Sequence, residues 1–194
     1  ARAEGYDAAM IMAPTELQNQ NIPKLLNECA TKPVAGLSEE EQYRTPCIYE
    51  PDVTLQAKTQ NRPKNKTYFI LYKTGGVEPE TMGKTFPECE AIFQAKNNAY
   101  QAQGKQMRIT GWTTPEHLLA QRKECENNKN HQWDSLNTEN KSNCSWLLDS
   151  KTTSGYVCAI WDRTFHKVNV HWYDASASLG GLGARSAVII ELEI

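Results

Sequence analysis

Residues 155–194 read GYVCAIWDRTFHKVNVHWYDASASLGGLGARSAVIIELEI and form the densest strand-like stretch of the chain. Residues 156–161 are rich in β-branched and aromatic side chains, and residues 168–172 alternate between apolar and polar ones. Both patterns predict strands. The small residues of 175–183 predict a loop, and the apolar run that begins at Ala187 predicts a closing strand. We therefore expect a C-terminal sheet that the rest of the chain covers or extends.

The preceding part of the chain predicts one strand and two helices. Residues 68–72 are wholly apolar, which favours a central strand buried on both faces. Two later segments, 86–103 and 115–127, begin with a pattern that is typical of helix N-termini. Thr85 precedes the first segment and Pro87 is its second residue, while Thr114 precedes the second segment, which starts at Pro115. The expected fold of residues 67–194 is therefore α+β, with an antiparallel sheet and two helices.

Two further units precede this domain. Apolar side chains recur at helical spacing over residues 1–30, interrupted at Pro14 and Pro23, and predict an amphipathic N-terminal helix. Residues 31–66 are rich in proline and charged side chains and predict a loop-rich linker.

Composition excludes two classes of partner. The net charge of the 194 residues is −2, with 21 basic and 23 acidic side chains, and no basic stripe dominates, so we expect no nucleic acid. No apolar run approaches the roughly 18 residues that a membrane helix needs, so we expect no membrane span in this chain.

The six cysteines predict disulfides. An even count spread along the chain suits three disulfides in an oxidising compartment, and the spacing contains neither Cys-x-x-Cys nor His-x-x-x-His, so it predicts no zinc site. Buried thiols in a cytosolic protein are the alternative. The layout favours the pairs Cys29–Cys47, Cys89–Cys158 and Cys125–Cys144, while other pairings stay open. We expect an extracellular or cell-surface location.

No catalytic motif occurs. The sequence lacks Gly-x-Ser-x-Gly, His-Glu-x-x-His and the phosphate-binding loop, and the glycines of 180–183 do not open a predicted helix. His166 and His171 are five residues apart, so on one strand they face opposite sides and share no metal. We therefore predict a protein that is not an enzyme and has no cofactor and no metal.

The candidate ligand site lies in two loop regions, 128–150 and 174–184. Aromatic rings among many Asn side chains suit sugar stacking and amide–hydroxyl hydrogen bonds, although the same rings also suit closure of the core. The predicted ligand-binding residues are Trp133, Asn137, Asn143 and Tyr173.

Three motifs resemble the C-type-lectin-like domain found at the ends of bacterial surface adhesins, over residues 66–194. They are Gly111-Trp112-Thr113-Thr114-Pro115-Glu116-His117-Leu118, then Ser145-Trp146-Leu147-Leu148, then Arg185-Ser186-Ala187-Val188. The resemblance implies a domain that binds a protein or carbohydrate on a host or neighbouring cell. The calcium motifs Glu-Pro-Asn and Trp-Asn-Asp of animal lectins are absent.

A second resemblance concerns the first ten residues, ARAEGYDAAM, which look like the start of the soluble part of type IV pilins. It implies a filament subunit that self-assembles through residues 1–30, with a long hydrophobic helix before Ala1. A secreted hydrolase with a site built from scattered acids is a further alternative. The expected function is non-enzymatic binding or adhesion outside the cell.

Overall fold

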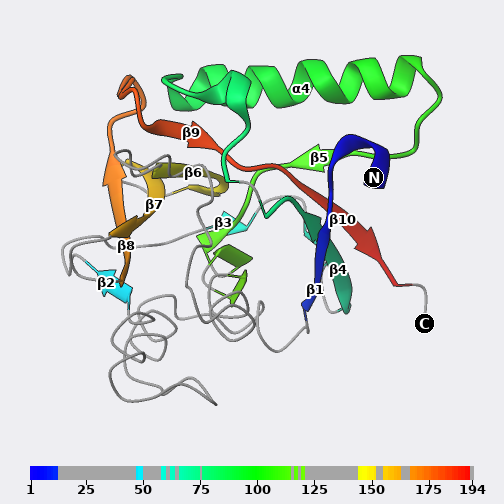
Figure 1. Cartoon of the computed structure of the whole chain (residues 1–194), viewed down its shortest axis with the longest axis horizontal. Helices are drawn as coiled ribbons and strands as arrows, with labels where there is room; N and C mark the ends of the chain where they lie inside the picture. Colours follow the sequence, from blue (N-terminus) through cyan, green and yellow to red (C-terminus); the bar gives the residue numbers. More distant parts are fainter. Residues whose placement is uncertain are drawn as a thin grey trace.

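A computed structural model gives the fold, two β-sheets and one long helix (Figure 1). The residues that it describes are 1–12, 47–49, 58–59, 62–63, 66–74, 76–114, 116–117, 119–120, 144–151, 155–162 and 167–192. The α+β class predicted from the sequence is confirmed. None of the described helices is long and apolar enough to cross a membrane.

The first sheet has four antiparallel strands in the order β1-β4-β10-β5. Their bounds are Ala8–Met12 for β1, Tyr68–Tyr72 for β4, Ala187–Glu191 for β10 and Ile109–Thr110 for β5. The central position predicted for β4 is confirmed. Its burial is one-sided, because Tyr68, Ile70 and Tyr72 are fully buried while Phe69 and Leu71 are half-buried.

The second sheet is built on an antiparallel meander of β6 (Cys144–Lys151), β7 (Tyr156–Asp162) and β8 (Lys167–Tyr173). The short β2 (Cys47–Tyr49) extends it in parallel beside β8. Two short strands, β3 (Lys58–Thr59) and β9 (Leu182–Ala184), share the other edge of β6. The strands predicted over 156–161 and 168–172 are therefore confirmed.

Residues 182–191 join the two sheets, because β9 belongs to the second sheet and β10 to the first (Figure 1). The connection is tight: a Cβ on Gly183 would lie 2.9 Å from Cγ2 of Val77. Between the strands, the Ser186 carbonyl accepts a hydrogen bond from Trp112 Nε1 at 3.2 Å. Small residues in this stretch thus allow a close crossing, and part of the predicted 175–183 loop is strand β9.

Helix α4 (Phe86–Ala102) runs along one side of the molecule above β5 and β6 (Figure 1). Thr85 caps its N-terminus in a capping box with Glu88, as the Thr-x-x-Glu pattern favours. The predicted helix over 86–103 is confirmed. The remaining short elements are the 3-10 turns η1 (Arg2–Glu4) and η2 (Pro79–Thr81). The second predicted helix, 115–127, is described only in part, and its described residues up to Ala120 are helical.

Two clusters of buried side chains form the core, and both draw on both sheets. The first contains Met10, Met12, Tyr68, Ile70, Tyr72, Trp112, Leu147, Val157 and Val170. The second, beneath α4, contains Phe86, Cys89, Phe93, Ile109, Trp146, Leu148, Cys158, Leu182 and Val188. Leu147 enters one cluster, and its neighbours Trp146 and Leu148 enter the other, as period-two alternation requires. Strand β6 is therefore covered on both faces.

The helix predicted over residues 1–30 is wrong for the part that the structure describes. Ala8–Met12 is strand β1, paired along its length with β4, and only Arg2–Glu4 form a 3-10 turn. Met10 and Met12 are buried while Ile11 is 59% exposed, which is strand periodicity. Pairing with β4 stabilises a strand here by more than the local helical spacing of apolar residues stabilises a helix. The described N-terminal residues therefore do not form the helix that the pilin resemblance implies.

Disulfides are a second correction. Among the described side chains, Cys89, Cys144 and Cys158 are buried and form no disulfide. The predicted bond Cys89–Cys158 is therefore not formed, and β-strand register places Cys158 beside Cys144 and His171. The predicted bond Cys125–Cys144 is not formed either, because Cys144 is a free thiol, while Cys125 lies outside the described residues. The predicted pair Cys29–Cys47 lies outside the described side chains.

Candidate functional site

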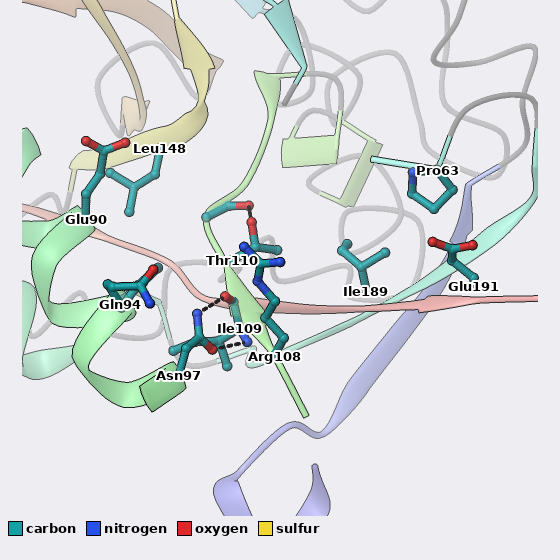
Figure 2. Close-up of a pocket in the computed structure, with 12 residues that line it drawn as sticks. Pro63, Glu90, Gln94, Asn97, Arg108, Ile109, Thr110, Leu148, Ile189 and Glu191 are labelled. Atoms are coloured by element: carbon teal, nitrogen blue, oxygen red, sulfur yellow. Dashed lines mark hydrogen bonds between the residues drawn. The ribbon is translucent and has the colours of Figure 1, made fainter. Parts of the chain in front are cut away.

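A polar pocket of about 320 Å³ lies between helix α4, strand β5 and strand β10. Figure 2 shows Glu90 and Gln94 of α4 on one side, Thr110 of β5 and the preceding Arg108 in the middle, and Glu191 of β10 on the far side. The lining is Pro63, Glu90, Phe93, Gln94, Asn97, Arg108, Ile109, Thr110, Gly111, Leu148, Ile189 and Glu191.

Helical and strand periodicity bring these polar groups together. Glu90, Gln94 and Asn97 lie at i, i+4 and i+7, so they share one face of α4. Ile189 and Glu191 lie two apart on β10, so their side chains leave the same face of the sheet. The pocket thus presents carboxylate acceptors at both ends and amide and guanidinium donors between them.

The wall between α4 and β5 is fixed by a two-way amide contact. The Asn97 side chain donates to the Ile109 carbonyl at 2.8 Å, and the Ile109 N–H donates to Asn97 Oδ1 at 2.8 Å. Both residues are buried. The Asn97 side chain thus bonds to both backbone groups of Ile109, as a neighbouring strand would. This contact fixes helix α4 against strand β5, so the pocket between them is preformed.

The floor of the pocket needs a glycine. A Cβ on Gly111 would lie 2.3 Å from the Cβ of Leu148, a separation that side-chain atoms do not adopt. Glycine therefore allows the chain after β5 to lie directly on β6.

A buried ion pair between Arg62 and Glu116 holds Gly111 at the floor of the pocket. Arg62 donates to the Glu116 carboxylate through Nε at 2.5 Å and through Nη2 at 2.8 Å. Its Nη2 also donates to the Gly111 carbonyl at 2.7 Å. Tyr68 donates its hydroxyl to Glu116 Oε1 at 3.0 Å. Burial disfavours the carboxylate, but Arg62 and these further donors outweigh it and hold the pKa of Glu116 below its ordinary value.

A second polar group lies in the other sheet. Cys144 of β6, Cys158 of β7 and His171 of β8 place their ligand atoms within 4.8 Å of one another. Cys144 Sγ lies 3.6 Å from His171 Nε2, and Cys158 Sγ donates to the His171 carbonyl at 3.7 Å. Both thiols are buried, and the imidazole is half-buried. We call these three residues the thiol–imidazole cluster.

The cluster favours a thiolate at Cys144. Hydrogen bonding with Cys158 and then with His171 outweighs the opposing effect of burial, and lowers the pKa of Cys144 to about 6. By contrast, burial raises the pKa of Cys89 to about 12. A thiolate beside an imidazole suits two kinds of chemistry, metal ligation and nucleophilic attack.

The predicted ligand-binding residues are only partly placed. Trp133, Asn137 and Asn143 lie outside the described residues. Tyr173 ends β8, away from the pocket, and its ring packs edge-to-face against His171 with centroids 4.8 Å apart. The structure thus brings Tyr173 to the thiol–imidazole cluster.

Sequence reasoning missed both groups. The pocket residues Glu90 and Gln94 carry a signal, since they lie four apart and so share one face of the predicted helix, but Arg108 and Glu191 join them only through tertiary structure. No family model, curated protein or solved structure matches the chain. Functional inference therefore rests on the residues themselves.

Proposed function

We propose that this protein is a non-enzymatic binding or adhesion protein that acts outside the cell or on its surface. Its ligand is a carbohydrate presented by a host or neighbouring cell, and the polar pocket beside α4 holds it. The observation that carries this proposal is the lining of the pocket, in which carboxylates, an amide and a guanidinium surround a cavity of about 320 Å³.

Sugar hydroxyls suit this lining because each hydroxyl both donates and accepts a hydrogen bond. Glu90 and Glu191 offer carboxylate oxygens as acceptors, and Arg108 offers donors. Gln94 Nε2 donates to Asn98 Oδ1 at 2.9 Å, which leaves its second N–H as a donor and its Oε1 as an acceptor, so adjacent hydroxyls find both kinds of partner. Two carboxylates against one guanidinium disfavour an anionic ligand. The apolar side chains of Ile189 and Leu148 offer a surface for the C–H face of a sugar ring.

The C-type-lectin-like architecture and the surface location belong to the same proposal and rest on the adhesin resemblance. The tryptophans of its first two motifs, Trp112 and Trp146, are buried in the core, and so is Arg185 of the third. These burials support structural roles for the motifs. Because the motif residues are buried, ligand recognition falls to the pocket and to loops, which differ among such domains.

A glycan microarray probed with the whole chain tests the proposal. We expect binding to a restricted set of neutral glycans, weakened about tenfold or more by Arg108→Ala and by Gln94→Ala, because each change removes a hydrogen-bond donor from the pocket. Gln101→Ala is the matched control: it has the same residue type on the same helix, is exposed, and does not line the pocket.

Three results would contradict the proposal. One is the absence of binding to any glycan by the folded protein. Another is unchanged binding in both pocket variants. The third is equal weakening by Gln101→Ala, which would show that glycan binding does not depend on the pocket.

A further inference from the structure

The thiol–imidazole cluster is independent of the pocket and of the function proposed for it. Its three residues come from three neighbouring strands of the second sheet, β6, β7 and β8. Cys158 is the register partner of His171, and Cys144 lies two residues before Trp146, the register partner of Cys158. Residues two apart on a strand share a face, so Cys144, Cys158 and His171 all point the same way.

We propose that Cys144, Cys158 and His171 form a binding site for Zn²⁺, with two thiolates and one imidazole as ligands and a water molecule in the fourth position. Both sulfurs bind as thiolates, so any proton still carried by either thiol is released to solvent, and the two thiolates with Zn²⁺ sum to zero charge. No electron transfer is involved. The imidazole binds through Nε2, the nitrogen that faces Cys144 Sγ.

The separations fit a tetrahedral ion. Zinc–sulfur bonds of about 2.3 Å and zinc–nitrogen bonds of about 2.0–2.1 Å at tetrahedral angles place the ligand atoms roughly 3.5–3.8 Å apart. Cys144 Sγ and His171 Nε2 are 3.6 Å apart, and all three ligand atoms lie within 4.8 Å of one another. Small side-chain rotations therefore complete the site, and the paired strands hold the backbone in place.

Burial favours a metal ion over nucleophilic catalysis. Cys144 is 6% exposed and Cys158 is fully buried, so a substrate carbonyl has little access to either sulfur. A single ion needs far less room. The half-buried His171 is the most accessible of the three and leaves a route for the ion and for its water.

The surroundings also orient the imidazole. The Tyr173 ring packs edge-to-face on His171, and Tyr173 in turn packs against the buried Trp146 with centroids 6.3 Å apart. Packing of this kind fixes the ring plane of a ligand, which is one way in which residues around a metal site raise its affinity. Tyr173 is thus a positioning residue in this proposal.

Cobalt substitution tests the site directly. The reduced 194-residue chain is titrated with Co²⁺ without oxygen, and the absorption spectrum is recorded before and after Zn²⁺ is added. We expect one tightly bound Co²⁺ per chain, with thiolate-to-metal absorption in the near ultraviolet and intense visible bands of a tetrahedral ion, both abolished when Zn²⁺ displaces it.

Variants assign the ligands. Cys144→Ser, Cys158→Ser and His171→Gln should each weaken Co²⁺ binding at least 100-fold. The matched control is Cys89→Ser, which removes a buried thiol outside the cluster and should leave the spectrum unchanged. Circular dichroism of the metal-free variants separates loss of a ligand from loss of the fold.

The outcomes that overturn the site are distinct from those that bear on glycan binding. An absence of thiolate-to-cobalt absorption overturns it, and so does a spectrum that persists in folded Cys144→Ser. A Cys144–Cys158 disulfide, found by mass spectrometry of the protein isolated without reductant, overturns it as well. Carbohydrate binding through the pocket would be unaffected by each of these results.

Discussion

At the scale of single residues, Glu116 shows how a charge is kept inside this protein. Its side chain is 0% exposed, and that of its partner Arg62 is 4% exposed. Burial of an isolated carboxylate is costly, so the group needs a full set of donors. Arg62, Tyr68 and the Thr113 N–H supply them. Since Arg62 also holds the Gly111 carbonyl, the same pair ties the pocket floor to the core.

We predict that Glu116→Gln destabilises the protein at pH 7 by about 3–5 kcal/mol, because it leaves Arg62 buried without its counter-charge. Urea unfolding measures the change. Glu191→Gln is the control, since Glu191 pairs with Lys66 at 3.3 Å with both side chains more than half exposed, and such pairs contribute about 0–1 kcal/mol. Equal stability losses in the two variants would contradict this account of Glu116.

The pH dependence of that difference has a definite sign. The pKa of Glu116 is lower in the folded protein than its ordinary value of 4.5, so its contribution to stability is present above pH 4.5 and is lost as the pH falls below it. The difference in unfolding free energy between wild type and Glu116→Gln should therefore become smaller as the pH falls below 4.5.

At the scale of elements, the contact between α4 and β5 depends on Asn97. Its amide satisfies both backbone groups of Ile109, and no water-exposed alternative is at hand because both residues are buried. Helix α4 is therefore held against the sheet by this polar contact together with the apolar packing of Phe93 and Cys89.

We predict that Asn97→Ala costs about 2–4 kcal/mol of unfolding free energy, because it leaves the N–H and the carbonyl of Ile109 buried without partners. Asn97→Asp should not recover this loss, because it replaces the donor to the Ile109 carbonyl with a buried carboxylate oxygen. The control is Asn98→Ala on the exposed side of the same helix, expected within about 0.5 kcal/mol of wild type in the same denaturation experiment. A loss as large in Asn98→Ala would contradict this account, because alanine is the better helix former and Asn98 makes no hydrogen bond with Ile109.

The elements differ in how far the sequence predicts them. β4, β7, β8, β10 and α4 carry strong periodicity or a capping pattern, and each lies where its pattern places it. β1 does not, because its alternation becomes visible only once Met10 and Met12 are seen to pair with β4. β9 has a short, small-residue sequence whose strand form depends on its neighbour β6.

The candidate sites were harder to predict than the elements that carry them. Sequence spacing argued against a zinc site, since no two ligands lie in a short motif. Cys144, Cys158 and His171 meet because the β6–β7 and β7–β8 registers bring residues 13 or 14 apart onto one face. The pocket likewise needs the placement of α4 against β5 and β10. Both are products of tertiary pairing, which local patterns do not determine.

At the scale of the whole molecule, the two sheets divide the proposed roles. The pocket lies mainly on the first sheet and α4, with Leu148 of β6 in its lining, and the thiol–imidazole cluster belongs to the second sheet. The β9–β10 crossing links them through the core (Figure 1). We therefore treat metal binding and ligand binding as separable properties of one domain.

Hydrogen–deuterium exchange of the whole chain, with and without a glycan selected on the array, tests the central claim most directly. Our account predicts that the glycan slows amide exchange at residues 90–97 of α4 and residues 108–111 around β5, because these segments line the pocket. Slower exchange confined to residues 128–143 and 174–181, with none at the pocket, would contradict it and would place recognition outside the pocket.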